Sequence, residues 1–215
     1  VTISGSIAIN GHVAVGEGAT NPQAVVVGDT TLITGNPPVV AQSNNLQMPA
    51  ASLPTGLTCS TALTVSGNTT RTLPADGGAN CNASNECCFS SLSVSGGGAL
   101  TASGPVTVYV TGAFSATGNT VIGVSSDPAQ MLFILSSPQQ ATLEGDLTGS
   151  TQFYGGLYAP TGRIEISGNA EIFGSVTAQY VDITGSARIH YDEAMTEVGP
   201  PGSYRIDVLS WHEPN

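Results

Sequence analysis

The chain of 215 residues is long enough for one large domain, and 40% of it is hydrophobic, so it can bury a sizeable core. Only 9% of the residues are charged, and 15 acidic against 4 basic residues give a formal net charge of −11. This balance argues against a nucleic-acid-binding surface, which needs clustered positive charge, and against binding to anionic lipid.

The 27 glycines and the scarcity of charge are typical of repetitive β structure, in which short strands meet at glycine-rich turns. The apolar residues are periodic and β-branched, which argues against disorder. No apolar run approaches the roughly 20 residues of a membrane span, and the first residues read as strand, turn and strand. We expect no membrane span in this chain, and interpret it as a fragment or as a processed form that has lost a targeting segment.

In chain order, residues 1–35 are short strands interrupted by glycine, and we expect them to form opening coils of a stack. Residues 36–54 are rich in proline, which cannot join a β ladder, and are predicted to form a strap along the surface. Residues 55–91 have the poorest periodicity and are predicted to form a loop region that its cysteines brace.

The four cysteines of this region are Cys59, Cys81, Cys87 and Cys88. They lack the CxxC pairs and nearby histidines of a metal site, so two disulfides in an oxidising compartment are the better interpretation. Adjacent cysteines rarely bond each other, which leaves two connectivities open. Either Cys59 pairs with Cys87 and Cys81 with Cys88, or Cys59 pairs with Cys88 and Cys81 with Cys87.

Residues 92–195 are predicted to form the main stack, because they contain one structural unit written twice. Apolar residues alternate with polar ones on both sides of a glycine turn, and a turn of this kind repeated at a fixed period encodes a β-solenoid coil. The recurring positions, 17 residues apart, are Ile164, Ile166, Ala170 and Ile172 followed by Val181, Ile183, Ala187 and Ile189. The turn glycines predicted for successive coils are Gly118, Gly145, Gly168 and Gly185.

Residues 196–215 are predicted to form a capping tail, because the stretch from Tyr204 to Trp211 alternates as a final strand. A docked strand of this kind would cover the terminal coil, whose open edge otherwise promotes aggregation. We expect Tyr204 and Trp211 to be buried by this docking rather than to bind a ligand. The whole chain therefore predicts a single all-β solenoid domain.

The 17-residue register predicts two contacts between outward-facing charges. Glu171 falls against Arg188, which makes an exposed ion pair, and Glu165 falls against Asp182, which brings two carboxylates together. Glu165 and Asp182 are the candidate surface contact for a cation or a glycan, although two solvated carboxylates are the interpretation that we favour. Calcium requires more oxygen ligands than these two residues offer, so no metal site is expected.

Other β-helices carry polysaccharide lyases and hydrolases, whose paired carboxylates and basic residue would here be Glu165, Asp182 and Arg163. The inventory is thin, and we expect no catalytic residue, no cofactor and no enzymatic activity. His190 falls at an outward position before a capping turn, where a structural hydrogen bond is favoured over catalysis.

The segment from Phe153 to Ala194 also carries a family resemblance. The stretch Phe153–Pro160, the hexapeptide Ile189–Ala194 and the final Ser210-Trp211 resemble the C-terminal solenoid domain of PilX-like proteins, which are bacterial type IV pilus-assembly or minor-pilin-like proteins. The resemblance covers residues 92–215, and the hydrophobic prepilin-like helix of that family is missing from this sequence. It implies an extracellular, right-handed parallel β-helix with no catalytic residues to carry over.

The sequence therefore predicts an extracellular structural protein of the bacterial cell surface that acts in assembly or adhesion. Its expected partners are pilin-like proteins, surface glycans or a second copy of itself, because an uncapped first coil would offer an unpaired edge for end-to-end stacking. The alternative is a carbohydrate-binding or carbohydrate-cleaving β-helix protein.

Overall fold

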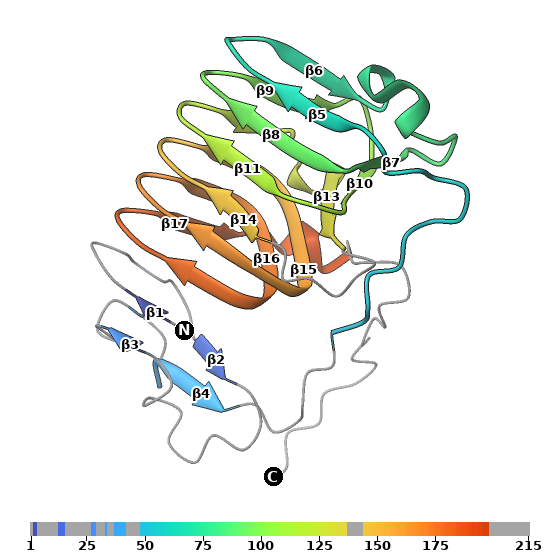
Figure 1. Ribbon diagram of the computed structural model, residues 1–215. Helices are drawn as coiled ribbons and strands as arrows, with labels where there is room; N and C mark the ends of the chain where they lie inside the picture. Colours follow the sequence, from blue (N-terminus) through green and yellow to red (C-terminus); the bar gives the residue numbers. More distant parts are fainter. Residues whose placement is uncertain are drawn as a thin grey trace.

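The chain is all-β, and successive passes of it stack on one another in a solenoid-like arrangement (Figure 1). The computed structural model describes residues 2–3, 13–15, 27–28, 33, 37–41, 48–136 and 144–197. Strands of neighbouring coils pair in parallel throughout this part, so residues at equivalent positions form columns that run along the stack. The predicted capping tail, with Tyr204 and Trp211, lies outside the described residues.

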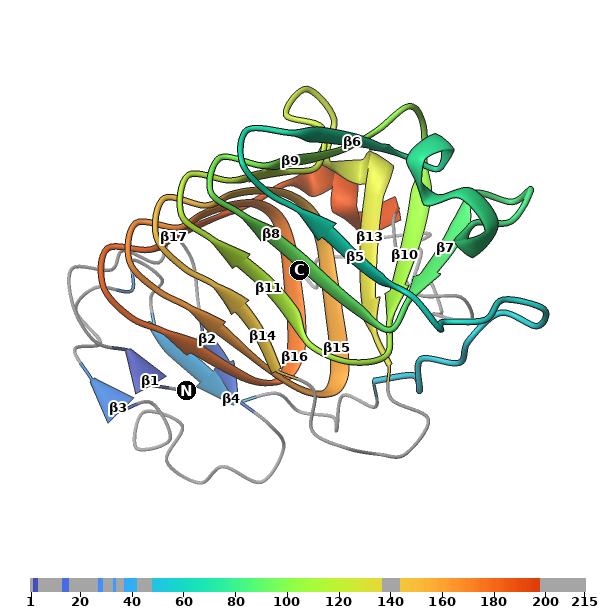
Figure 2. The ribbon, with the colours of Figure 1, turned by 45° about the horizontal axis from the view of Figure 1, so that its top comes forward.

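Three faces form the wall of the stack, and the long strands β15 and β16 contribute to all of them (Figure 2). The front face consists of β5 (Ala62–Val65), β8 (Ser91–Ser95), β11 (Phe114–Thr117), β14 (Glu144–Leu147) and the last parts of β15 (Gln152–Ile166) and β16 (Glu171–Ile183). The aromatic face consists of β6 (Thr70–Leu73), β9 (Ala99–Ala102), β12 (Val121–Ile122), the first parts of β15 and β16, and β17 (Arg188–Tyr191). The strap face consists of β7 (Glu86–Phe89), β10 (Val106–Val110), β13 (Met131–Leu135) and the middle of β15 and β16. Three short 3₁₀ helices are η3 (Ala75–Asn80), η4 (Pro128–Gln130) and η5 (Glu193–Glu197).

The predicted loop region of residues 55–91 is in part strand, since it contains β5, β6 and β7. These strands form because they stack in register on later coils, as when Leu63 pairs with Leu92 and Val65 with Val94. Stacking of this kind is a long-range contact, and the weak local pattern of residues 55–91 does not reveal it.

The N-terminal strands lie at the end of the stack where the main coils finish. β1 (Thr2–Ile3) pairs with β16 on one side and with β3 (Val27–Gly28) on the other, while β2 (Val13–Val15) pairs with β4 (Val39–Ala41). The chain then passes to the opposite end, where β5 begins (Figure 1). The expectation that the first strand offers an unpaired edge is therefore wrong.

The predicted 17-residue register is confirmed within the last coils. Ile164 pairs with Val181, Ile166 with Ile183, and Ile172 with Ile189. In the earlier part of the same strand pair Gln152 faces Glu171, an offset of 19 residues, and a bulge between Ala159 and Arg163 shortens it to 17. The repeat thus fixes the length of one coil, not of every coil.

The turn glycines stack directly on one another. Gly149, Gly168 and Gly185 have φ values of 75°, 71° and 79°, and each lies against the backbone of the preceding turn glycine, beginning at Gly118. The turn predicted at Gly145 is wrong, because this residue lies inside β14, opposite Phe114 and Ile164. The turn follows β14, where the left-handed backbone at Gly149 needs a residue without Cβ.

The interior of the stack is one continuous hydrophobic core. At its centre Phe114, Phe133 and Phe153 come from three different coils, with ring centroids 5.3–6.4 Å apart. All three rings are almost completely buried, as expected for alternating strands whose every second residue points inward.

A second, smaller core lies outside the wall, where residues 48–59 run along the strap face. Tyr158 donates a 2.5 Å hydrogen bond to the carbonyl of Pro49, and Ser136 donates one of 2.6 Å to the carbonyl of Ala51. The strap packs on Cys88, Tyr109, Leu132, Ile134 and Tyr158 through Met48, Ala51, Leu53, Leu57 and Cys59. The strap face is therefore covered, whereas the other two faces carry the exposed side chains described below.

The disulfides select one of the two connectivities that the sequence leaves open. Cys59 bonds Cys88, which pins the end of the strap to β7, and Cys81 bonds Cys87 at the β5–β6 end of the stack. The two bridges close segments of very different length, with sequence separations of 29 and 6 residues. Because a longer closed loop restricts the unfolded chain more, the Cys59–Cys88 bond is the more stabilising of the two.

Removing one hydroxyl under the strap separates hydrogen bonding from packing. We expect Tyr158→Phe to lower the free energy of unfolding by about 0.5–1.5 kcal/mol, because Pro49 loses its donor. Tyr109→Phe is the matched control, since the Tyr109 hydroxyl is buried without a hydrogen-bond partner among the described residues, and it is expected to change stability little. Urea denaturation at neutral pH measures both, and equal losses would contradict the assignment.

The same two tyrosines predict an alkaline limit to stability. Burial raises the pKa of both phenols above the ordinary value of 10.0, and Glu86 adds to the shift at Tyr109. The folded state holds these protons more tightly than the unfolded state, so stability is intact below pH 10 and falls as the pH rises beyond it. In denaturation at increasing pH, either phenylalanine variant is expected to show a shallower decline.

Candidate functional site

The predicted carboxylate pair lies on the front face. Glu165 on β15 and Asp182 on β16 are in register on adjacent coils, as the 17-residue repeat predicts. Arg163, two residues before Glu165, forms an ion pair with Asp182. Arg163 and Asp182 therefore compensate each other, and Glu165 lies beside this pair.

Asp146 extends the carboxylates into a column of three, and sequence reasoning missed it. Asp146 on β14 is in register with Glu165, and Asp182 follows on the next coil. At the strand spacing of about 4.8 Å, like charges in water repel by roughly 1 kcal/mol, which the ion pair of Asp182 with Arg163 offsets at one end of the column. The available signal is the alternation of residues 144–147, which the glycine within it obscures by favouring a turn.

Above the carboxylates the same column is hydroxylic. Asp146 is in register with Ser115, which is followed by Ser93 and Thr64 on the next coils. Ser115 donates a 3.2 Å hydrogen bond to the Ser93 hydroxyl. The front face is thus divided along the stack into a half with small hydroxyl groups and a half with carboxylates.

The second predicted charge contact is confirmed on the aromatic face. Arg188 on β17 donates a 2.8 Å hydrogen bond to the carboxylate of Glu171 on β16. The Arg188 side chain is 62% exposed, so solvent screens the pair.

We expect Arg188→Gln to lower the free energy of unfolding by no more than about 1 kcal/mol, because exposed ion pairs contribute little. The loss is expected to shrink further in high salt, which screens the charge and leaves the packing of the side chain unchanged. Thermal denaturation at low and high ionic strength measures it. A larger loss that salt does not reduce would mean that Arg188 acts through packing instead.

Three aromatic side chains form a ladder next to this ion pair, and the sequence analysis did not anticipate it. Tyr154, Phe173 and His190 occupy one outward column on β15, β16 and β17. Their rings stack almost parallel, with centroids 4.9 Å and 4.7 Å apart. His190 is exposed at the end of the ladder, and Tyr191 beside it is 61% exposed. The described contact of His190 is therefore ring stacking, in place of the hydrogen bond expected from the sequence.

Two further features bear on the kind of site. Among the described residues, no group of three or more histidine, cysteine, aspartate and glutamate side chains is arranged to hold a metal ion. No helix in the described part of the chain is long and apolar enough to cross a membrane. The carboxylate column and the aromatic ladder are thus surface features of two uncovered faces, each built from adjacent coils of the stack.

Comparison with known proteins places the chain in a family. Residues 76–198, more than half of the chain, match the family described as Domain of unknown function (DUF7305), and the chain belongs to this family. No curated protein and no solved structure gives a significant match. The matched part begins within η3 and runs through β17, so it includes the carboxylate column and the aromatic ladder.

Proposed function

We propose that this chain is a non-enzymatic structural module of the bacterial cell surface, which acts in pilus-associated assembly or in adhesion. The observation that carries the proposal is a charge-poor parallel stack in which two disulfides fasten the strap and one end. Disulfides persist in oxidising compartments, and a stack of this kind holds its shape without a ligand or a metal ion. The resemblance to the solenoid domain of PilX-like proteins supports the association with pili.

The proposed handedness of the stack is right-handed, which makes it a right-handed parallel β-helix. Parallel strands joined by crossover connections adopt this hand in nearly all known cases, because strand twist favours it. Its uncovered front and aromatic faces would carry the contacts with pilin-like proteins.

Surface labelling in the producing bacterium tests this function. An antibody against the native domain is expected to label intact cells, with gold particles along or at the base of surface filaments in electron micrographs. Non-reducing mass spectrometry of the secreted material is expected to find both disulfides. Label confined to the cell interior, together with four alkylatable thiols, would overturn the proposal.

Carbohydrate binding is the second candidate function, and the carboxylate column with its neighbouring arginine favours it. Asp146, Glu165 and Arg163 supply hydrogen-bond acceptors and donors at neighbouring positions, and Tyr180, 59% exposed, lies in register with Arg163. A glycan array tests it with the variants Glu165→Ala and Asp182→Ala. Binding that both variants weaken would support this function, while unchanged binding would remove the front face from consideration.

A further inference from the structure

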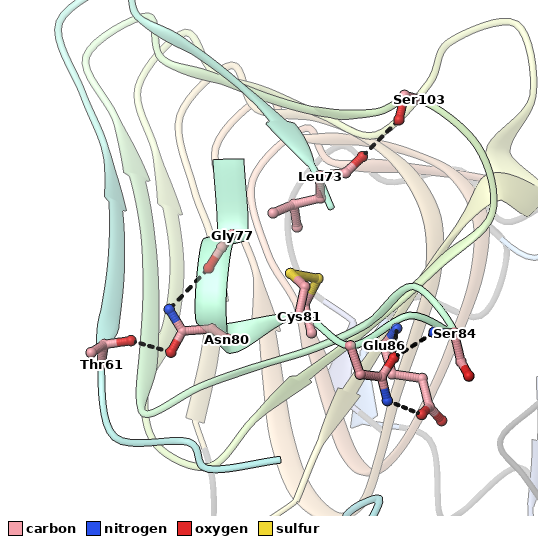
Figure 3. The surroundings of a disulfide bond; sticks show 10 residues. Thr61, Leu73, Gly77, Asn80, Cys81, Ser84, Glu86 and Ser103 are labelled. Atoms are coloured by element: carbon pink, nitrogen blue, oxygen red, sulfur yellow. Dashed lines mark hydrogen bonds between the residues drawn. A yellow bond between two sulfur atoms is a disulfide. The ribbon is translucent and has the colours of Figure 1, made fainter. Parts of the chain in front are cut away.

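One end of the stack is closed by a plug, which we define as residues 74–85. β5 and β6 are the first strands at this end, and among the described residues each pairs on one side only, with β8 and β9 respectively. The plug contains η3 and folds back over the coil that these strands begin, inside the outline of the stacked coils (Figure 3).

The plug replaces the coil that would otherwise cover the core. Leu73, the last residue of β6, is completely buried although no described coil lies beyond it. Gly77 of η3 lies directly over this side chain and against the sulfur of Cys81, so a Cβ atom at Gly77 would lie 3.2 Å from Leu73 Cδ2 and would collide with Cys81 Sγ. The Cys81–Cys87 disulfide then ties the plug to β7, whose Cys87 is also completely buried.

Apart from that disulfide, the plug is held by a few polar contacts near its surface. The Thr61 hydroxyl donates a 2.5 Å hydrogen bond to the Asn80 side chain, which in turn donates one of 3.1 Å to the carbonyl of Gly77 (Figure 3). The backbone N–H of Thr72 donates a 2.6 Å hydrogen bond to the carboxylate of Asp76. The Thr61 and Thr72 contacts are exposed, where each hydrogen bond stabilises by about 1 kcal/mol. The disulfide is therefore the strongest attachment.

Arg71 gives this end a second obstacle to stacking. It is in register with Leu100, which heads a column of buried core residues that continues through Ile122 and Phe153. Arg71 occupies the core position of the terminal coil and is exposed. Natural sheets use inward-pointing charges at an edge to prevent another sheet from adding there, because pairing would bury the charge.

We propose that the β5–β6 end is a surface for head-to-tail association with a second copy of this chain, and that the plug and Arg71 hold it closed. A second copy fits because the sheet runs in parallel register from β3 at one end to β5 at the other. A copy added at β5 would repeat the contact that β8 already makes there. Such a head-to-tail contact does not close on itself and generates fibres. The inference goes beyond the proposed function, since it requires neither a pilus nor a cell surface.

The experiment opens the plug and leaves the strap fastened. The variant Cys81→Ser with Cys87→Ser and Arg71→Leu removes the disulfide and the charge. Its matched control, Cys59→Ser with Cys88→Ser, removes the other disulfide and keeps the plug. Sedimentation velocity is measured for both and for the wild type over a roughly hundredfold range of concentration, with far-UV circular dichroism to verify the fold.

We expect the wild type and the control to keep the mass of one chain, and the opened variant to rise roughly twofold or more in average mass and form rods in electron micrographs. A folded opened variant that stays monomeric over the whole range would overturn the proposal. If the opened variant loses its β signal, Gly77→Leu with Arg71→Leu decides, because it wedges the plug away and leaves both disulfides intact. Loss of the fold there too would also overturn the proposal, since the plug would then be part of the folding core.

Discussion

Replacing Gly168 by alanine is expected to lower the free energy of unfolding by about 2–5 kcal/mol. Gly168 has a φ of 71°, a backbone conformation that disfavours any residue with a Cβ atom. The added Cβ would also lie 2.9 Å from the backbone N and 3.0 Å from the backbone O of Gly149. Backbone atoms in a stacked turn cannot move aside as the end of a flexible side chain can. Urea denaturation followed by circular dichroism measures the loss.

Gly67→Ala is the matched control for this prediction, because Gly67 is the turn glycine of the first coil. Its φ of 62° imposes the same conformational penalty, but an added Cβ would meet nothing within 4 Å. We expect this variant to lose only about 1–2 kcal/mol. Equal losses at Gly67 and Gly168 would show that backbone conformation alone, and not contact between stacked turns, requires glycine in this column.

Sequence reasoning predicts the stack where its coils repeat at a constant length. The contacts of Glu165 with Asp182 and of Glu171 with Arg188 lie between coils offset by 17 residues, so counting positions is enough to find them. The offset from β14 to the next coil is longer. A count of 17 residues back from Glu165 leads to Thr148, whereas the residue in register with Glu165 is Asp146. The same count therefore passes over the third carboxylate.

The aromatic ladder escapes the sequence analysis for a different reason. Tyr154 and Phe173 each follow an inward apolar residue and precede a glycine, Gly155 and Gly174, which are in register with each other. This short pattern of apolar residue, aromatic residue and glycine is the available signal, but it lies outside the 17-residue repeat that begins at Ile164. Stacking of the rings then follows from strand spacing, because side chains in one column of a parallel sheet lie about 4.8 Å apart.

The plug and the N-terminal strands are beyond sequence reasoning, because both depend on contacts between distant parts of the chain. β1 contributes two residues, Thr2 and Ile3, to its pairing with β16, too few for a recognisable pattern. The plug is irregular backbone whose position is set by a disulfide to Cys87 and by the burial of Leu73. Local periodicity carries information about which face of a strand is buried, but not about which coil follows which in space.

Replacing Phe133 by alanine is expected to lower the free energy of unfolding by about 3–5 kcal/mol. Phe133 is completely buried, and its ring lies 5.6 Å from that of Phe114 and 5.3 Å from that of Phe153, centroid to centroid. Its removal would leave a cavity between three coils, and the backbone ladders on both sides prevent the wall from collapsing into it. Urea denaturation measures the loss.

Phe173→Ala is the matched control, since it deletes the same ring from the outside of the wall. Phe173 is half-buried, and its ring contacts those of Tyr154 and His190 in the aromatic ladder. We expect a loss of about 1–2 kcal/mol, because only the stacking contacts disappear and water fills the vacated space. A loss at Phe173 as large as that at Phe133 would contradict this division and would make the ladder part of the framework of the stack. The smaller loss would leave the ladder free to serve as a contact surface, since its rings could then change without unfolding the coils beneath them.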